Sequence, residues 1–134
     1  MLKGELDKAI ADFTEAIRLD PNDAKFYSHL GITYTAKGES DKTIANYTEA
    51  IRLVPNDARV FGGRGSTYMQ KGELDKAIAD FSEAIRLTPN DAELFSRRGI
   101  AYRLKGELDK ASADFTEAIR LDPELGGSHC SGGE

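Results

Sequence analysis

The chain has 134 residues, 40% of them hydrophobic and 31% charged, which is ordinary for one soluble domain with its own core. Its formal net charge of −5 argues against general nucleic-acid binding, and no apolar run approaches the ~18 residues that span a membrane. The single cysteine, Cys130, cannot form an internal disulfide, and no signal segment opens the sequence, so we expect a cytoplasmic protein.

The four prolines recur at one constant interval, at Pro21, Pro55, Pro89 and Pro123. The sequence between them repeats in step. Residues 3–24 read KGELDKAIADFTEAIRLDPNDA, and residues 71–92 read KGELDKAIADFSEAIRLTPNDA. A fixed period of this length predicts a stacked array of short structural repeats.

Each period contains two amphipathic segments with helical spacing of the apolar residues. A glycine follows the first segment, as is common where a helix ends in a left-handed residue, and a proline ends the second. Before residue 24 there is only a segment of the second type. We therefore expect helices near residues 6–19, 24–37, 41–53, 58–71, 75–87, 92–105 and 109–121.

Several sets of residues recur at this period, and they carry a family resemblance. The sets are Tyr27, Phe61 and Phe95; Gly31, Gly65 and Gly99; Tyr34, Tyr68 and Tyr102; Ala77 and Ala111; Tyr47, Phe81 and Phe115; and Ala50, Ala84 and Ala118. Over residues 1–125 the chain resembles the tetratricopeptide repeat family.

The resemblance implies an all-α fold, an α-solenoid of stacked helix-turn-helix units in a right-handed superhelix. Residues 1–23 would form a half repeat, and the ranges 24–57, 58–91 and 92–125 would form full repeats. The Gly/Ser-rich residues 126–134 are typical of a flexible tail.

No combination of residues suggests catalysis. The two histidines are His29 and His129, and the run Ser128–Cys130 lies within the expected tail. A single Cys/His pair offers too few ligands for zinc, which takes about four. We therefore expect no enzymatic activity, no cofactor and no metal.

The second helices are nearly copies of one another, whereas the first helices vary along one face. In proteins that this chain resembles, that face lines the concave groove and binds peptides or partner segments. Neutral drift on an exposed face is the alternative. The candidate groove residues are Lys25, Ser28, His29, Ile32, Arg59, Gly62, Gly63, Ser66, Met69, Arg97, Ile100 and Arg103.

The charge of the first helices predicts the kind of partner. They carry nine cations against Glu93 alone: Lys25, Lys37, Arg59, Arg64, Lys71, Arg97, Arg98, Arg103 and Lys105. A basic inner surface would attract an acidic peptide or protein segment. Some family members clamp a chaperone C-terminus with Lys, Asn and Arg, but these first helices contain no asparagine, so we do not expect that specificity.

An alternative function is structural self-assembly. The first and last helices each lack one neighbour, so apolar surface at both ends could join copies into a homo-oligomer. We expect neither a nucleic-acid nor a membrane partner.

Two further expectations concern unusual residues of the first helices. Arg64 occurs with Asp80 and Arg98 with Asp114, whereas Leu30 occurs with Asn46, so we expect the ion pairs Arg64–Asp80 and Arg98–Asp114 within their units. Glycine at position 65 is expected from packing, because the absence of a side chain lets neighbouring helices approach closely. Gly62 and Gly63 have no packing reason that is evident, and we expect them to leave an open floor in the groove.

Overall fold

The computed structural model describes residues 2–125, and this part of the chain is helical without a strand. Seven helices of 13 to 17 residues are followed by one helical turn at residues 123–125. The helices are α1 (Lys3–Leu19), α2 (Ala24–Lys37), α3 (Ser40–Leu53), α4 (Ala58–Gln70), α5 (Leu74–Leu87), α6 (Ala92–Lys105) and α7 (Leu108–Leu121). The expected tail at 126–134 lies outside the described residues.

Six of the seven helices begin and end within one residue of the expected positions, but α1 begins three residues early, at Lys3. In the later units the equivalent glycines turn the chain between two helices. No helix precedes α1 within the described residues, so Gly4 simply continues it. The backbone N–H groups of Glu5 and Leu6 donate to the carbonyl of Leu2 and close its first turn.

The turns within the pairs depend on glycine in a left-handed conformation. Gly38, Gly72 and Gly106 have φ values of 81°, 81° and 87°, which side-chain-bearing residues rarely adopt. The turns between pairs end in aspartates that cap the next helix. The Oδ1 atom of Asp23, for example, accepts the backbone N–H of Lys25 at 3.0 Å.

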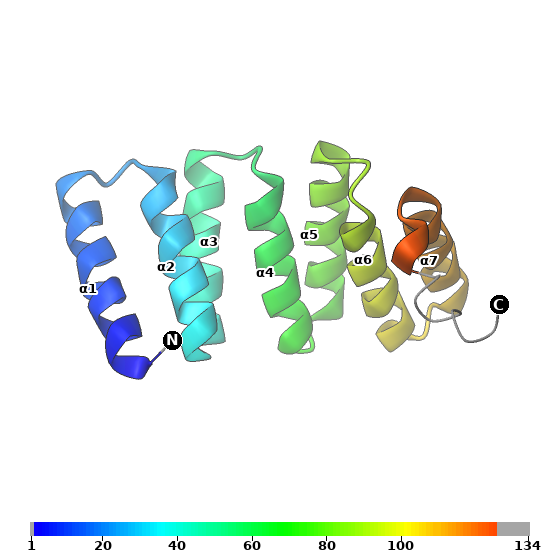
Figure 1. The fold of residues 1–134 in the computed structure, drawn as a ribbon, viewed down its shortest axis with the longest axis horizontal. Coiled ribbons are helices and arrows are strands. Elements are labelled where there is room, and N and C mark those ends of the chain that lie inside the picture. The colour runs from blue at the N-terminus through cyan, green and yellow to red at the C-terminus, as the bar shows by residue number, and fades with distance from the viewer. Residues whose placement is uncertain (1, 126–134) are drawn as a thin grey trace.

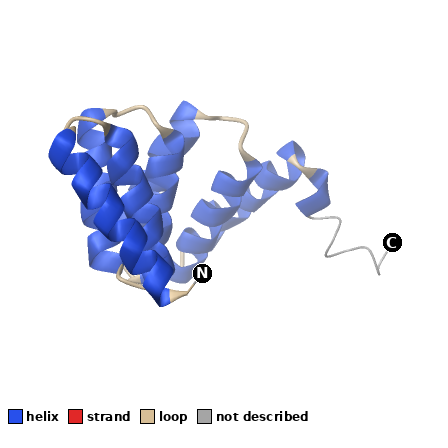
Figure 2. Cartoon of the chain, turned by 60° about the vertical axis from the view of Figure 1, so that its left-hand side comes forward, coloured by secondary structure: helices blue, strands red, loops and turns tan. Residues whose placement is uncertain are grey.

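The helices follow one another along the long axis in chain order and form the expected α-solenoid (Figure 1). Each helix packs on its neighbours in sequence, and α4 also contacts α6. Figure 2 shows the same array turned by 60°, with helices joined by short loops. Within residues 2–125, no helix is both long enough and apolar enough to cross a membrane.

Aromatic side chains of the second helices pack where the first helices have glycine. The position of a Cβ on Gly31 lies 2.5 Å from the Tyr47 ring, and that of a Cβ on Gly65 lies 3.0 Å from Phe81. A side chain there would displace the aromatic ring, so glycine sets how closely the helices of one unit approach. The core of the middle unit is fully enclosed, with Phe81 at 0% exposure.

Candidate functional site

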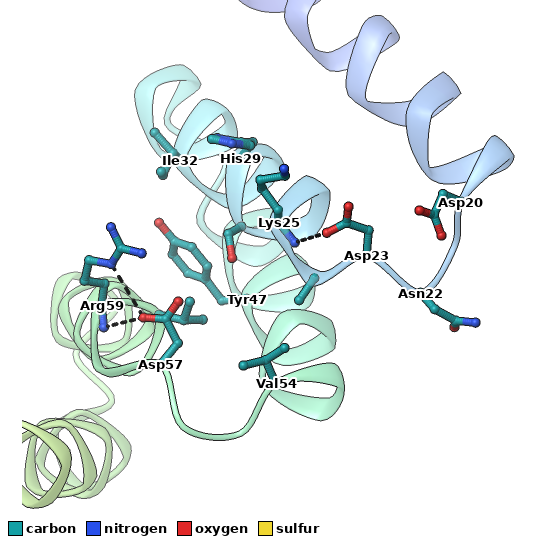
Figure 3. Close-up of a pocket in the computed structure, with 13 residues that line it drawn as sticks. Asp20, Asn22, Asp23, Lys25, His29, Ile32, Tyr47, Val54, Asp57 and Arg59 are labelled. Carbon is teal, nitrogen blue, oxygen red and sulfur yellow. Dashed lines mark hydrogen bonds and ion pairs between the residues drawn. The ribbon is translucent and has the colours of Figure 1, made fainter.

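A pocket of about 780 Å³ opens between α2 and α4, and Figure 3 shows the residues that line it. Its walls come from the α1–α2 turn, α2, the second half of α3, the α3–α4 turn and the start of α4. The lining residues are Asp20, Asn22, Asp23, Ala24, Lys25, Ser28, His29, Ile32, Tyr47, Val54, Asp57, Arg59 and Val60. This volume lies in the range of sites that hold a small molecule or several side chains.

The Tyr47 ring reaches the pocket from α3 and is only 7% exposed. Two glycines make room for it, because its ring atoms lie 2.5 Å and 2.9 Å from the Cβ positions of Gly31 and Gly63. Burial raises the pKa of the Tyr47 hydroxyl, and a hydrogen bond with Thr35 opposes that shift. The hydroxyl therefore stays neutral at physiological pH, and the pocket gains an aromatic wall with one polar tip.

Aliphatic side chains complete the apolar part of the pocket. Val60 is buried beside Tyr47 and Ala50, whereas Ile32 and Val54 remain 58% and 41% exposed. These two side chains present surface to the pocket that the protein itself does not cover. In Figure 3, Ile32 and Val54 lie at opposite ends of the Tyr47 side chain.

The charged groups around the pocket have mixed sign. Lys25 and Arg59 contribute cations, and Asp20, Asp23 and Asp57 contribute carboxylates. Asp23 and Asp57 already accept the backbone N–H groups of Lys25 and Arg59 at 3.0 Å, and Asp57 lies 3.6 Å from Arg59 Nε. Two of the three carboxylates are thus held by helix N-termini, where the helix dipole favours negative charge.

His29 stands at the α1 side of the pocket. Its ring stacks on Phe13 of α1 with centroids 5.1 Å apart and an interplanar angle of 13°. The imidazole therefore forms part of the wall between α1 and α2 in addition to lining the pocket.

The structure brings five of the candidate groove residues together in this pocket: Lys25, Ser28, His29, Ile32 and Arg59. Sequence reasoning missed Tyr47, Val54 and Val60, because it looked only at the variable face of the first helices. A signal for Val60 was present. The equivalent residues of the other two units, Phe26 and Leu94, are both larger.

The expectation of an open floor at Gly62 and Gly63 is wrong. Gly62 is buried, and Leu94 Cδ2 lies 3.3 Å from where its Cβ would be. Gly63 faces the Tyr47 ring, with three ring and hydroxyl atoms within 3.1 Å of its Cβ position. Side chains from neighbouring helices cover both glycines, so Gly63 has the packing reason that the sequence did not reveal.

The other candidates lie toward α6 and are engaged with the protein itself. Arg97 Nη1 donates to Ser66 Oγ at 2.7 Å, and Arg97 Nε lies 3.1 Å from Glu93. Met69 packs against the core around Phe81, and Ile100 is half-buried. The guanidinium of Arg103 lies 6.0 Å from the centre of the Phe115 ring.

The sequence count overstated how basic the groove is, because five of the nine cations pair with carboxylates of other helices. Lys37, Lys71 and Lys105 approach Asp7, Asp41 and Asp75 of the preceding unit at 2.8, 2.5 and 2.6 Å. The other two are the expected arginine pairs. The remaining cations are Lys25, Arg59, Arg97 and Arg103.

Both expected arginine–aspartate pairs are present in the structure. Arg64 Nε and Nη2 donate to the two oxygens of Asp80 at 2.8 and 2.9 Å, and Arg98 makes the same bidentate contact with Asp114 at 2.8 Å. Each arginine also reaches the preceding unit, where Thr48 or Ser82 accepts a hydrogen bond at 3.0 Å. These arginines join neighbouring units and do not line the pocket.

Within residues 2–125, no cluster of three or more His, Cys, Asp or Glu side chains could hold a metal ion. The pocket offers hydrogen-bonding groups and apolar walls, an arrangement suited to binding.

Family models match most of the chain. A model described as TPR repeat covers residues 1–38 and 65–105, and two described as tetratricopeptide repeat cover residues 24–57 and 92–125. No curated protein matches the sequence significantly.

Solved structures with the same fold include a crystal structure of MamA, with 28% identity and a TM-score of 0.87 over 90% of this chain and 71% of that one. A second is the first TPR of Spaghetti (RPAP3) bound to the HSP90 peptide SRMEEVD, with 26% identity and a TM-score of 0.72 over 75% of this chain and 79% of that one. The chain therefore belongs to the tetratricopeptide repeat family, whose repeats are protein-interaction scaffolds and typically have no enzymatic activity.

Proposed function

We propose that this protein binds an extended, acidic segment of a partner protein along the face formed by α2, α4 and α6. The observation that carries the proposal is the open pocket between α2 and α4, which has cationic side chains at its mouth and uncovered aliphatic surface inside. Such a surface binds a ligand that has both carboxylates and apolar side chains.

The preference for acidic partners rests on four cations. Lys25, Arg59, Arg97 and Arg103 belong to the faces of the first helices, and Arg59 is 94% exposed. Within residues 2–125, Lys25 and Arg103 form no side-chain ion pair, and the Arg59–Asp57 contact at 3.6 Å is long, whereas Arg97 already has Glu93 of its own helix at 3.1 Å. These cations raise the association rate of an anionic segment, and the attraction weakens as salt is added.

One of the structural neighbours supports this choice. The first TPR of Spaghetti is bound to the HSP90 peptide SRMEEVD, which contains two glutamates, one aspartate and two apolar residues. For the present chain the peptide is a convenient probe. We do not infer the same clamp on the terminal carboxylate, because α2, α4 and α6 contain no asparagine.

The test uses fluorescein-labelled SRMEEVD and a control peptide in which the acids are replaced by glutamines, measured by fluorescence polarisation. We expect the acidic peptide to bind more tightly at 50 mM than at 500 mM salt. Replacing Arg59 and Arg97 by glutamine should weaken binding by at least about fivefold. Neutral and acidic peptides that bind equally would overturn the acidic preference.

A matched control changes the same total charge away from this face. Lys76 and Lys110 lie at the starts of α5 and α7, above Tyr68 and Tyr102. Their replacement by glutamine should leave the affinity within about twofold of the wild type. An equal loss of affinity in both double variants would show that net charge alone, without a site, attracts the peptide.

We propose self-association as a second candidate function, on the basis of exposed apolar side chains on the terminal helices. Leu108 and Ile119 of α7 are 63% and 45% exposed, and Leu19 of α1 is 69% exposed. Sedimentation velocity over a hundredfold range of concentration tests this candidate. A concentration-dependent increase in mass that Ile119→Glu abolishes would favour it, and a monomer throughout would rule it out.

A further inference from the structure

We propose that the pocket between α2 and α4 receives one aliphatic side chain of the bound segment, such as leucine, with acidic residues flanking it. This inference rests on the proposed function and specifies the ligand. Two junctions of the same chain differ at the positions that would seat such a side chain. The first junction lies between the α2–α3 pair and α4, and the second lies one repeat later, between the α4–α5 pair and α6.

At the second junction the protein supplies an aliphatic side chain of its own. Leu94, the third residue of α6, belongs to a core cluster with Phe81, Ala84 and Ile85. Its Cδ2 atom fills the space above Gly62. At the first junction the equivalent residue is Val60, whose side chain is one carbon shorter, and the pocket opens beside it.

The surroundings of the two junctions also differ in polarity. Val54 and Ile32 expose aliphatic surface in the first junction. Their equivalents in the second junction are the polar Thr88 and Ser66. Thr88 Oγ1 donates to the carbonyl of Ala84 at 2.9 Å, and Ser66 Oγ accepts from Arg97 at 2.7 Å. Polar groups at the second junction are thus satisfied within the chain.

A ligand that covers the aliphatic surface at the first junction removes it from water, and this burial contributes favourable free energy to binding. The chain itself indicates the chemistry of the missing group. Leucine is the side chain that packs between the equivalent helices one unit later, and the first junction keeps the apolar surface of Tyr47, Val54 and Val60 for such a group.

The charges at the mouth determine what flanks this side chain. Lys25 and Arg59 lie on the two helices that border the pocket. The carboxylates of Asp23 and Asp57 accept backbone N–H groups at helix N-termini, which leaves the two cations and the third carboxylate, Asp20 at the end of α1, as the charged groups free to meet a ligand. A segment with glutamates on both sides of a leucine matches this arrangement.

The test uses fluorescein-labelled peptides Gly-Glu-Glu-X-Glu-Glu-amide, with X as leucine, alanine or serine. We expect the leucine peptide to bind the wild-type protein about tenfold more tightly than the alanine peptide. The serine peptide should bind like the alanine peptide or more weakly. The amidated end removes any contribution from a terminal carboxylate.

Three substitutions copy residues of the second junction into the first, and the same fold already carries each of them one unit later. Val60→Leu extends a longer aliphatic side chain into the pocket, as Leu94 does one unit later, and Ile32→Ser with Val54→Thr copies the polar pair. The single variant and the double variant should each reduce the ratio of leucine-peptide affinity to alanine-peptide affinity to about two or less, while the affinity for the alanine peptide stays the same. Ile119→Ala, a substitution of an exposed residue outside the pocket, should leave the ratio unchanged. Thermal melts followed by circular dichroism establish that each variant is folded.

The outcomes separate the two proposals. Acidic peptides that bind with no preference for leucine would overturn the anchor inference and leave the acidic groove standing. A leucine preference that survives both sets of pocket substitutions would place the anchor elsewhere and also overturn it. Failure of every peptide to bind would overturn the groove and the anchor together.

Discussion

The two junctions of this array are built from nearly the same sequence, yet one is open and the other is filled. The second helices that support them, α3 and α5, present an aromatic residue at the same place, Tyr47 or Phe81. The differences lie around those rings: Val60 against Leu94, Val54 against Thr88, Ile32 against Ser66, and Ser28 against Gly62. The repeated positions set the helix geometry, and a few variable ones decide whether aliphatic surface at a junction stays uncovered.

The units also differ in how their two helices are joined. The second and third full units use the pairs Arg64–Asp80 and Arg98–Asp114, whereas the first unit has the buried Leu30 at the arginine position. Its Asn46 side chain donates instead to the carbonyl of Lys42 at 2.9 Å. One chain therefore contains an apolar and an ionic solution to the same packing problem, which makes the energetic contribution of the ion pair measurable.

The largest expected effect is the loss of one partner of an ion pair. Asp80→Ala should lower the free energy of unfolding by about 3 kcal/mol, because it leaves Arg64 charged and without a carboxylate in a site where its side chain is only 17% exposed. The Asp80 carboxylate raises the pKa of Arg64, so the arginine does not escape the penalty by losing its proton. Urea denaturation at pH 7 measures the change.

The first unit supplies the control for this prediction. Arg64→Leu combined with Asp80→Asn reproduces the pair Leu30 and Asn46, and the introduced amide can bond the carbonyl of Lys76. This double variant should lie within about 1.5 kcal/mol of the wild type. If Asp80→Ala alone costs less than about 1 kcal/mol, the pair is a surface contact in energetic terms.

The next effect distinguishes the two adjacent glycines of α4. Gly63→Ala should destabilise the protein by about 1–3 kcal/mol, because the new methyl group would lie 2.9 Å from the Tyr47 ring. Gly62→Ala meets only the flexible end of Leu94 at 3.3 Å and gains helix propensity, so its thermal midpoint should rise. Equal shifts in the two melting curves would contradict the assignment of Gly63 to the packing of Tyr47.

Much of the fold was predictable from the sequence because its determinants are local and repeat. Prolines, turn glycines and capping aspartates recur once in every repeat, so six of the seven helices lie within one residue of their expected bounds. The early start of α1 was not predictable from the repeat. In the later units the residues equivalent to Lys3 and Gly4 form a turn after a preceding helix, whereas Lys3 and Gly4 themselves belong to α1.

The site was less predictable, because its openness depends on contacts between helices that are distant in sequence. Counting cations on the first helices gave a basic groove, but Lys37, Lys71 and Lys105 reach back to carboxylates of the preceding unit. Likewise, Gly63 is explained by Tyr47, which also belongs to the preceding unit. The arginine pairs were predictable because two equivalent positions vary together between the units. Where Leu30 replaces the arginine, Asn46 replaces the aspartate.

A smaller effect is expected from opening the second junction. Leu94→Val, which copies Val60, should cost about 1 kcal/mol, because it removes one buried carbon from the cluster around Phe81. The thermal midpoint and the free energy of unfolding in urea report this loss. A variant as stable as the wild type would show that the neighbouring side chains repack, and that Leu94 does not by itself keep the second junction closed.

The smallest effect concerns the lysines that link successive units at the glycine turns. Lys37, Lys71 and Lys105 also contact Glu39, Glu73 and Glu107. The pKa of each glutamate is lowered below the ordinary 4.5, that of Glu39 by Lys42 and then Lys37, that of Glu73 by Lys76 and then Lys71, and that of Glu107 by Lys105 and then Lys110. A carboxylate whose pKa is lower in the folded state stabilises that state above pH 4.5, and the contribution is lost as the pH falls through the lowered value.

Replacing the three linking lysines by glutamine should therefore destabilise the protein slightly at pH 7, and the difference from the wild type should shrink between pH 4.5 and pH 2.5. Because these groups are exposed, 500 mM salt should reduce the same difference at pH 7. Urea midpoints of both proteins across this pH range make the comparison. A difference that stays constant down to pH 2.5 would mean that the lysines stabilise the array through the packing of their aliphatic stems, independently of the carboxylates they contact.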